Sequence, residues 1–204
     1  ALPVVDSEER LVGIITVDDV IDILQEESSE AMEKMAAITP ADKPYLKSGV
    51  FKIYCTRIPW LLLLMISATF TGIIITSFEA ALAASVALTA FIPMLMGTGG
   101  NSGSQSSVTL IRVLALGEVQ LRDIGRVLWK ELRVALLCGV TLALAVYVKL
   151  QLVDRWLLGT AVTASEALVI CLTLAFTVVC AKLLGCTLPL LAKRLGFDPA
   201  VMAS

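Results

Sequence analysis

The sequence predicts an all-α polytopic membrane domain with four complete transmembrane helices and the start of a fifth, preceded by an α/β fragment and an amphipathic helix. Three observations support this fold class. The 204 residues are 57% hydrophobic and only 17% charged, whereas soluble domains carry about 25% charged residues. The mean hydropathy is +0.87. Residues 1–42 hold 11 acids and 2 bases, so an acidic head precedes a basic, apolar body.

The first 35 or so residues predict two strands and a helix. The runs at residues 2–5 and 11–15 are short and β-branched, and a polar turn separates them, which is typical of paired strands. Thr16 is a suitable N-cap for a helix that begins at Val17 and continues to about residue 37. This unit is too small to bury a core, so we expect it to be part of a larger domain whose natural start precedes Ala1.

The predicted first helix carries a stripe of carboxylates. At 100° per residue, its acids fall within an arc of about 80°, and they are Asp19, Asp22, Glu26, Glu30 and Glu33. Two interpretations stay open. The stripe is either a solvated acidic face, or a set of mutually repelling carboxylates that a divalent cation stabilises.

The rest of the chain reads as a linker followed by spans. Residues 45–56 predict a short amphipathic helix along the cytoplasmic membrane face. Charge-free cores of spans follow at residues 58–78, 80–111, 134–148 and 167–181, and residues 196–204 resemble the first turns of a fifth helix.

Basic residues predict the orientation of these spans. With a cytoplasmic head, 12 of the bases fall in inside segments and 2 in outside segments. The inside set is Lys43, Lys47, Lys52, Arg57, Arg112, Arg122, Arg126, Lys130, Arg133, Lys182, Lys193 and Arg194, and the outside set is Lys149 and Arg155. We expect Lys182 to extend from its span to the inner interface.

Few acids belong to membrane segments, and a carboxylate deep in a bilayer costs about 2.5–3.5 kcal/mol. Asp198 is the leading candidate ion ligand, because it lies between Gly196 and Pro199, where irregular backbone is expected. Its alternative role is the N-cap of the fifth helix, with Pro199 at the first helical position. Glu79, in the outer turn between the first two spans, reads as a solvated acid more than as a ligand.

A polar, glycine-rich run at residues 97–105 adjoins the second span. It predicts either a flexible loop, or close helix packing through the Gly99–Gly103 pair, or a pore-lining segment. In a pore, small residues such as Gly97 and Gly100 leave room for a hydrated ion, and Asn101 and Gln105 supply neutral oxygens. The run lacks the lysine of a phosphate-binding loop.

Composition also excludes classes of function. The chain has no histidine, so it contains no HExxH zinc site and no Ser-His-Asp or Cys-His pair. Its five cysteines show no CxxC spacing and read as small hydrophobes. These facts argue against a membrane metalloprotease and favour a protein that is not an enzyme. No feature indicates a nucleic-acid partner.

Two sets of motifs resemble known families. The segments LPVVD at residues 2–6 and LVGIITVDD at 11–19 resemble the closing half of a CBS domain. The segments IPWLLL at 58–63, AFIP at 90–93, GTGGNSGSQ at 97–105 and LGFDPA at 195–200 resemble the membrane domain of MgtE magnesium channels. The order and spacing of all these pieces fit, so the resemblance covers essentially the whole chain.

The resemblance implies a domain organisation and a homodimer in the cell membrane. Residues 1–28 would be the end of a CBS domain, residues 29–57 an acidic connecting helix and plug helix, and residues 58–204 a transmembrane domain truncated in its fifth helix. The family's pore lies on the dimer axis, lined by the second and fifth spans.

The resemblance also implies ligands. Asp198 matches the pore aspartate that holds Mg²⁺, and Asp19, Asp22, Glu27 and Glu30 match regulatory Mg²⁺ positions. Thr16 and Asp19 match the general CBS nucleotide motif, so ATP at a complete CBS domain is a further expectation. The implied function is a Mg²⁺ channel that cytoplasmic Mg²⁺ closes. The alternatives are a non-transporting CBS-linked scaffold and a channel for Mn²⁺, Co²⁺ or Ni²⁺.

Overall fold

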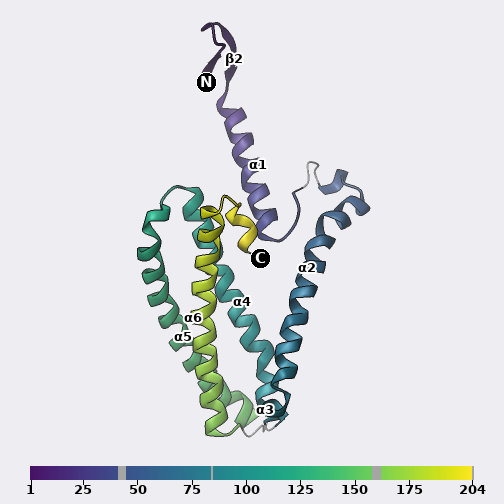
Figure 1. The fold of residues 1–204 in the computed structure, drawn as a ribbon, viewed down its shortest axis with the longest axis vertical. Coiled ribbons are helices and arrows are strands. Elements are labelled where there is room, and N and C mark those ends of the chain that lie inside the picture. The colour runs from purple at the N-terminus through teal and green to yellow at the C-terminus, as the bar shows by residue number, and fades with distance from the viewer. Residues whose placement is uncertain (41–44, 84, 158–161, 204) are drawn as a thin grey trace. The chain divides into compact units, whose positions relative to one another are not determined.

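The predicted fold class is confirmed, because helices dominate the computed structural model and a small two-stranded sheet lies at its amino terminus (Figure 1). The structure describes residues 1–40, 45–83, 85–157 and 162–203, and Lys43, which was expected on the inner side, lies outside these residues. The chain divides into two compact units, Ala1–Trp60 and Leu61–Ser204.

The first unit opens with the predicted hairpin. Strands β1 (Leu2–Val5) and β2 (Leu11–Ile15) pair antiparallel, with Leu2 opposite Ile15. Helix α1 follows as Val17–Met35, and Thr16 caps it through a reciprocal pair of hydrogen bonds with Asp19. The two strands and the cap therefore form where the sequence predicts them.

The linker departs from the prediction. A single 3₁₀ turn, η1 (Tyr45–Lys47), precedes helix α2, which runs without interruption over Val50–Ser77. The short helix expected at residues 45–56 is therefore not a separate element, because its second half continues into the first span. Pro59 lies inside α2 and does not end it; membrane helices tolerate proline when nearby groups satisfy the freed carbonyl.

Three long helices pack together in the second unit. After the short α3 (Glu79–Ala83), these are α4 (Val86–Ala115), α5 (Ile124–Lys149) and α6 (Ala164–Arg194). The shorter turns are η2 (Leu121–Asp123), the π-helical η3 (Leu150–Leu157) and η4 (Pro199–Ala203). Helix α6 packs against both α4 and α5, as the yellow-green helix between its neighbours in Figure 1 shows.

Among the described residues, three helices are long and apolar enough to cross a membrane: α2, the continuous helix Leu121–Asp154 that contains α5, and α6. Four spans were predicted. Helix α4, with 30 residues, has the length of the missing one, since about 20 residues cross a bilayer. Its polar middle, residues 97–105, lowers its hydropathy.

One stripe of α6 forms the centre of the bundle. Its buried positions recur every three or four residues, as one face of a helix requires, and include Ala167, Ile170, Leu174, Val178, Lys182, Cys186 and Leu190. Phe91 and Leu150 join this stripe near one end of the bundle, and Leu110 and Leu114 join it near the other. Lys182 is the one charged residue in the stripe.

Candidate functional site

The glycine-rich run at residues 97–105 is helical throughout and has two different faces. Gly97, Gly100, Asn101 and Gln105, the four predicted pore-lining residues, are all exposed on one face of α4. Gly99 is buried on the opposite face, toward α6. The flexible-loop interpretation is therefore wrong, whereas close packing and an open polar face occur together on one helix.

The open face of α4 borders two cavities. One, of about 550 Å³, is lined by Asn101, Ser104, Gln105, Val108 and Thr109. The other, of about 490 Å³, lies among α4, α5 and α6, and its lining is Thr98, Asn101, Ser102, Gln105, Leu137, Cys138, Thr141, Leu142 and Lys182. Asn101 and Gln105 line both cavities. Their amide oxygens are neutral hydrogen-bond acceptors, which suit the water molecules around a hydrated divalent cation.

The covered face of α4 approaches α6 very closely. A Cβ atom added to Gly103 would lie 3.1 Å from the carbonyl oxygen of Ala181, and one added to Gly185 would overlap the backbone of Gly103. Such an approach between helices requires residues without side chains. The Gly99–Gly103 pair thus serves helix packing, and this packing leaves Asn101 and Gln105 on the exposed side of α4.

A buried ion pair lies beside the cavity among α4, α5 and α6, and sequence reasoning missed it. The Lys182 ammonium is 3.7 Å from a Glu131 carboxylate oxygen and 3.4 Å from Ser106 Oγ, and Ser106 donates a hydrogen bond to Glu131. Lys182 is only 5% exposed, so the expectation that it extends to the interface was wrong. The signal was available, since Lys182 falls between Val178 and Cys186 in the buried period of α6.

Asp198 follows the end of α6. Gly196 adopts φ 81° just after the cap residue Leu195, a left-handed conformation that ends the helix. Asp198 is exposed, and its Oδ1 accepts a hydrogen bond from the backbone N–H of Ala200 at 2.9 Å. Asp198 therefore makes a cap-like hydrogen bond at η4, as its alternative role predicted. A carboxylate has about four acceptor sites, so this bond does not exclude a cation ligand.

The acidic residues of α1 are spread along the helix. The Asp19 carboxylate accepts hydrogen bonds from the Thr16 hydroxyl at 2.6 Å and the Thr16 N–H at 2.7 Å. These bonds lower the pKa of Asp19, the hydroxyl most strongly, so the group is ionised at neutral pH. Glu30 pairs with Lys34 at 2.8 Å, while Asp22 and Glu27 are exposed.

No three acidic, cysteine or histidine side chains gather closely enough to hold a metal ion within residues 1–40, 45–83, 85–157 and 162–203. The structure therefore does not bring Asp19, Asp22, Glu27 and Glu30 into one cluster. A metal site built from α1 would need ligands from a further surface, and its residues offer only oxygen donors, which suit Mg²⁺.

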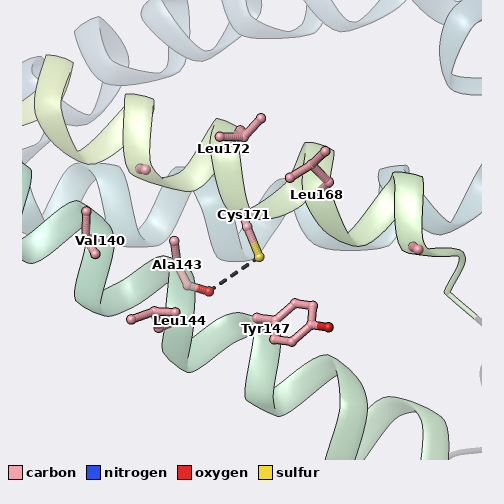
Figure 2. Close-up of a pocket in the computed structure, with 9 residues that line it drawn as sticks. Val140, Ala143, Leu144, Tyr147, Leu168, Cys171 and Leu172 are labelled. Carbon is pink, nitrogen blue, oxygen red and sulfur yellow. Dashed lines mark hydrogen bonds between the residues drawn. The ribbon is translucent and has the colours of Figure 1, made fainter.

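A third cavity, between α5 and α6, has a different chemistry. Figure 2 shows Val140, Ala143, Leu144 and Tyr147 of α5 opposite Leu168, Cys171 and Leu172 of α6. The Cys171 thiol donates to the carbonyl oxygen of Ala143 at 3.4 Å. The cavity has a volume of about 490 Å³, and its lining is apolar and offers no carboxylate. It therefore does not suit a cation.

Comparison with known proteins gives consistent similarities. The family described as MgtE, divalent cation transporter, matches residues 92–204, and the CBS domain family matches residues 1–26. The magnesium transporter MgtE of Thermus thermophilus is 40% identical over 203 residues, which are 100% of this chain and 43% of that protein. The magnesium transporter MgtE of Bacillus subtilis is 36% identical over 206 residues, covering 98% of this chain and 43% of that protein. The chain thus spans less than half the length of these curated relatives.

Proposed function

Because this chain belongs to the MgtE family of divalent cation transporters, we propose that the complete protein carries Mg²⁺ across the cell membrane into the cytoplasm. The observation that carries this proposal is the polar face of α4, where Asn101 and Gln105 border two cavities beside helices of spanning length. The relatives named magnesium transporters support Mg²⁺ as the cargo. We propose that the protein is a transporter and not an enzyme.

The proposed pore forms between two copies of the chain. One open face of α4 is a single wall, and a path for an ion requires a second wall, so a homodimer with two such faces satisfies the geometry. Asp198 of each copy would add a negative charge to this path. Mg²⁺ sheds water reluctantly, and two carboxylates can therefore select the hydrated ion without stripping it. The excess of basic residues in the predicted inside segments supports a cytoplasmic amino terminus.

The proposal includes feedback by internal Mg²⁺. At low Mg²⁺ the carboxylates of α1, including Asp22 and Glu27, repel each other and neighbouring acidic surfaces. At high Mg²⁺, bound ions favour a closed arrangement, and they shift the equilibrium only through tighter affinity for that arrangement. The Thr16 hydroxyl and the Asp19 carboxylate are hydrogen-bonded to each other. The proposal that ATP binds at a complete CBS domain therefore rests only on their sequence motif.

The test of the pore uses Mg²⁺ uptake by full-length protein in a magnesium-auxotrophic bacterium. We expect Asp198→Asn to reduce uptake at least about tenfold, because tenfold corresponds to the loss of only about 1.4 kcal/mol of ion interaction. Asparagine is as good an N-cap as aspartate, so this variant keeps the hydrogen bond to Ala200 and removes only the charge.

Two further variants interpret the result. Asp198→Ala removes both charge and cap, and Asp123→Asn removes an acid from the start of another helix. Loss with both Asp198 variants and uptake with Asp123→Asn would support an ion ligand. Normal uptake by Asp198→Asn at equal membrane expression would restrict Asp198 to capping. No rescue by the parent would reject Mg²⁺ transport, and competition by Mn²⁺, Co²⁺ and Ni²⁺ would rank the alternative cargoes.

The feedback is tested separately by limited proteolysis of the full-length protein. We expect millimolar Mg²⁺ to slow cleavage in residues 36–57, because bridged carboxylates hold the cytoplasmic surfaces together. Replacing Asp22 and Glu27 by Asn and Gln should abolish this protection. Cleavage that is equally fast with and without Mg²⁺ in the parent protein would reject the feedback while leaving transport untouched.

A further inference from the structure

The amino-terminal part of α5 carries a row of exposed basic and aromatic side chains, which we call the basic-aromatic stripe: Arg126, Trp129, Lys130 and Arg133. Their spacing of three, four and seven residues places all four within an arc of about 100° on one side of the helix. Each is exposed, with the Arg126 side chain 91% and Trp129 60% accessible. Helix packing does not account for this row, since all four side chains are exposed.

The stripe keeps its positive charge because nearby acids face elsewhere or lie at its margin. Glu131, in the middle of the sequence of the stripe, turns inward to Ser106 and Lys182. An Asp123 carboxylate oxygen lies 3.6 Å from an Arg126 guanidinium nitrogen, and the Arg126 side chain stays 91% exposed, so this pair neutralises little of its charge. The Arg133 guanidinium lies over the Trp129 ring, 5.9 Å from its centroid, and so the two side chains present one combined surface.

The position of the stripe along the helix matches the headgroup layer of a bilayer. The charge-free core at residues 134–148 begins directly after Arg133. The continuous helix Leu121–Asp154 has 34 residues, roughly 50 Å at 1.5 Å per residue, while the hydrocarbon core is only about 30 Å thick. Its excess length must extend into the polar layer. Tryptophan prefers this depth, and arginine can reach it from just below.

We propose that the basic-aromatic stripe binds the headgroup of an anionic phospholipid. Arginine binds phosphate oxygens through paired N–H donors, Lys130 adds a point charge, and the Trp129 indole anchors the helix at the boundary. A headgroup is the occupant that the observations favour, because the row runs along the helix axis through the layer where headgroups lie. This inference is independent of the transported ion and of the pore.

The test measures which lipids surround Trp129. Full-length protein with every other tryptophan replaced by phenylalanine, including Trp60 and Trp156, is placed in phosphatidylcholine vesicles. A minor fraction of the lipid is either brominated phosphatidylglycerol or brominated phosphatidylcholine, and quenching of Trp129 fluorescence by each gives their local ratio. We expect the anionic lipid to be enriched about fivefold or more, because each basic residue near the surface favours it by about that factor.

Matched variants show whether the stripe is responsible. Arg126→Gln/Arg133→Gln should lower the enrichment about fivefold or more, whereas Arg126→Lys/Arg133→Lys should retain much of it. Arg112→Gln/Arg194→Gln removes two exposed charges outside the stripe and should leave the enrichment unchanged. An equal fall in this control would overturn the proposal in favour of general attraction. Equal quenching by both brominated lipids in the parent protein would overturn the proposal as well. Quenching by neither lipid would also overturn it and would indicate a protein partner on the stripe.

Discussion

Alanine in place of Gly185 is expected to destabilise the membrane domain by about 3 kcal/mol, at the upper end of the usual cost of overpacking. The added Cβ would lie 2.9 Å from the carbonyl carbon of Gly103 and 3.1 Å from its Cα. These are backbone atoms, so no side-chain rotation can relieve the overlap, and α4 and α6 must move apart. Thermal unfolding of the purified full-length protein in detergent measures the loss.

A glycine in open surroundings provides the control. Gly72 lies inside α2, and nothing would lie within 4 Å of a Cβ there. Gly72→Ala should therefore leave the melting temperature unchanged or raise it slightly, since alanine is the better helix former. Equal melting temperatures for Gly185→Ala and Gly72→Ala would show that the close crossing of α4 and α6 does not exist in the protein. The crossing orients Asn101, so its loss should also reduce Mg²⁺ uptake.

The sequence prediction was most accurate at the amino terminus, where local signals determine the structure. The β-branched runs, the polar turn and the Thr16 cap are each determined by a few neighbouring residues, and the structure has all of them where the sequence predicts them. The membrane helices were recognisable because a charge-free run of about 20 residues has few alternatives. Their ends were less predictable, since the first charge-free core begins at residue 58 whereas α2 begins at Val50.

The candidate site was predictable in its composition but not in its arrangement. Residues 97–105 suggested packing and a pore as alternatives, and only the helical period of α4 shows that Gly103 and Asn101 serve opposite faces. Partners that are distant in sequence were beyond prediction. Lys182 and Glu131 are 51 positions apart, on different helices, and no local pattern links them. Asp198 remains a predicted ligand, because its hydrogen bond to Ala200 is compatible with either role.

Lys182→Met is expected to destabilise the membrane domain by about 3–5 kcal/mol, because it leaves the Glu131 carboxylate without its buried counter-charge. The side chains of Lys182 and Glu131 are only 7% and 22% exposed, so water compensates little. Lys34→Met is the control, since the Lys34 and Glu30 side chains pair on α1 and are more open to solvent, at 27% and 46% exposed. We expect a smaller change in stability there. Denaturant titration of each full-length variant gives the free energies of unfolding.

The double variant Lys182→Met/Glu131→Leu separates the pair from its parts. Replacing both charges by apolar side chains of similar size is often neutral or stabilising, and Ser106 can still donate to the Ser102 carbonyl, its second acceptor at 3.4 Å. We therefore expect the double variant to recover most of the stability lost by Lys182→Met. Additive losses would instead show that the two side chains do not interact. Lys182 also lines the cavity that Asn101 and Gln105 border. A stable double variant with reduced Mg²⁺ uptake would therefore assign the buried pair a role in the electrostatics of the ion path. Normal uptake would restrict the pair to holding α4, α5 and α6 together.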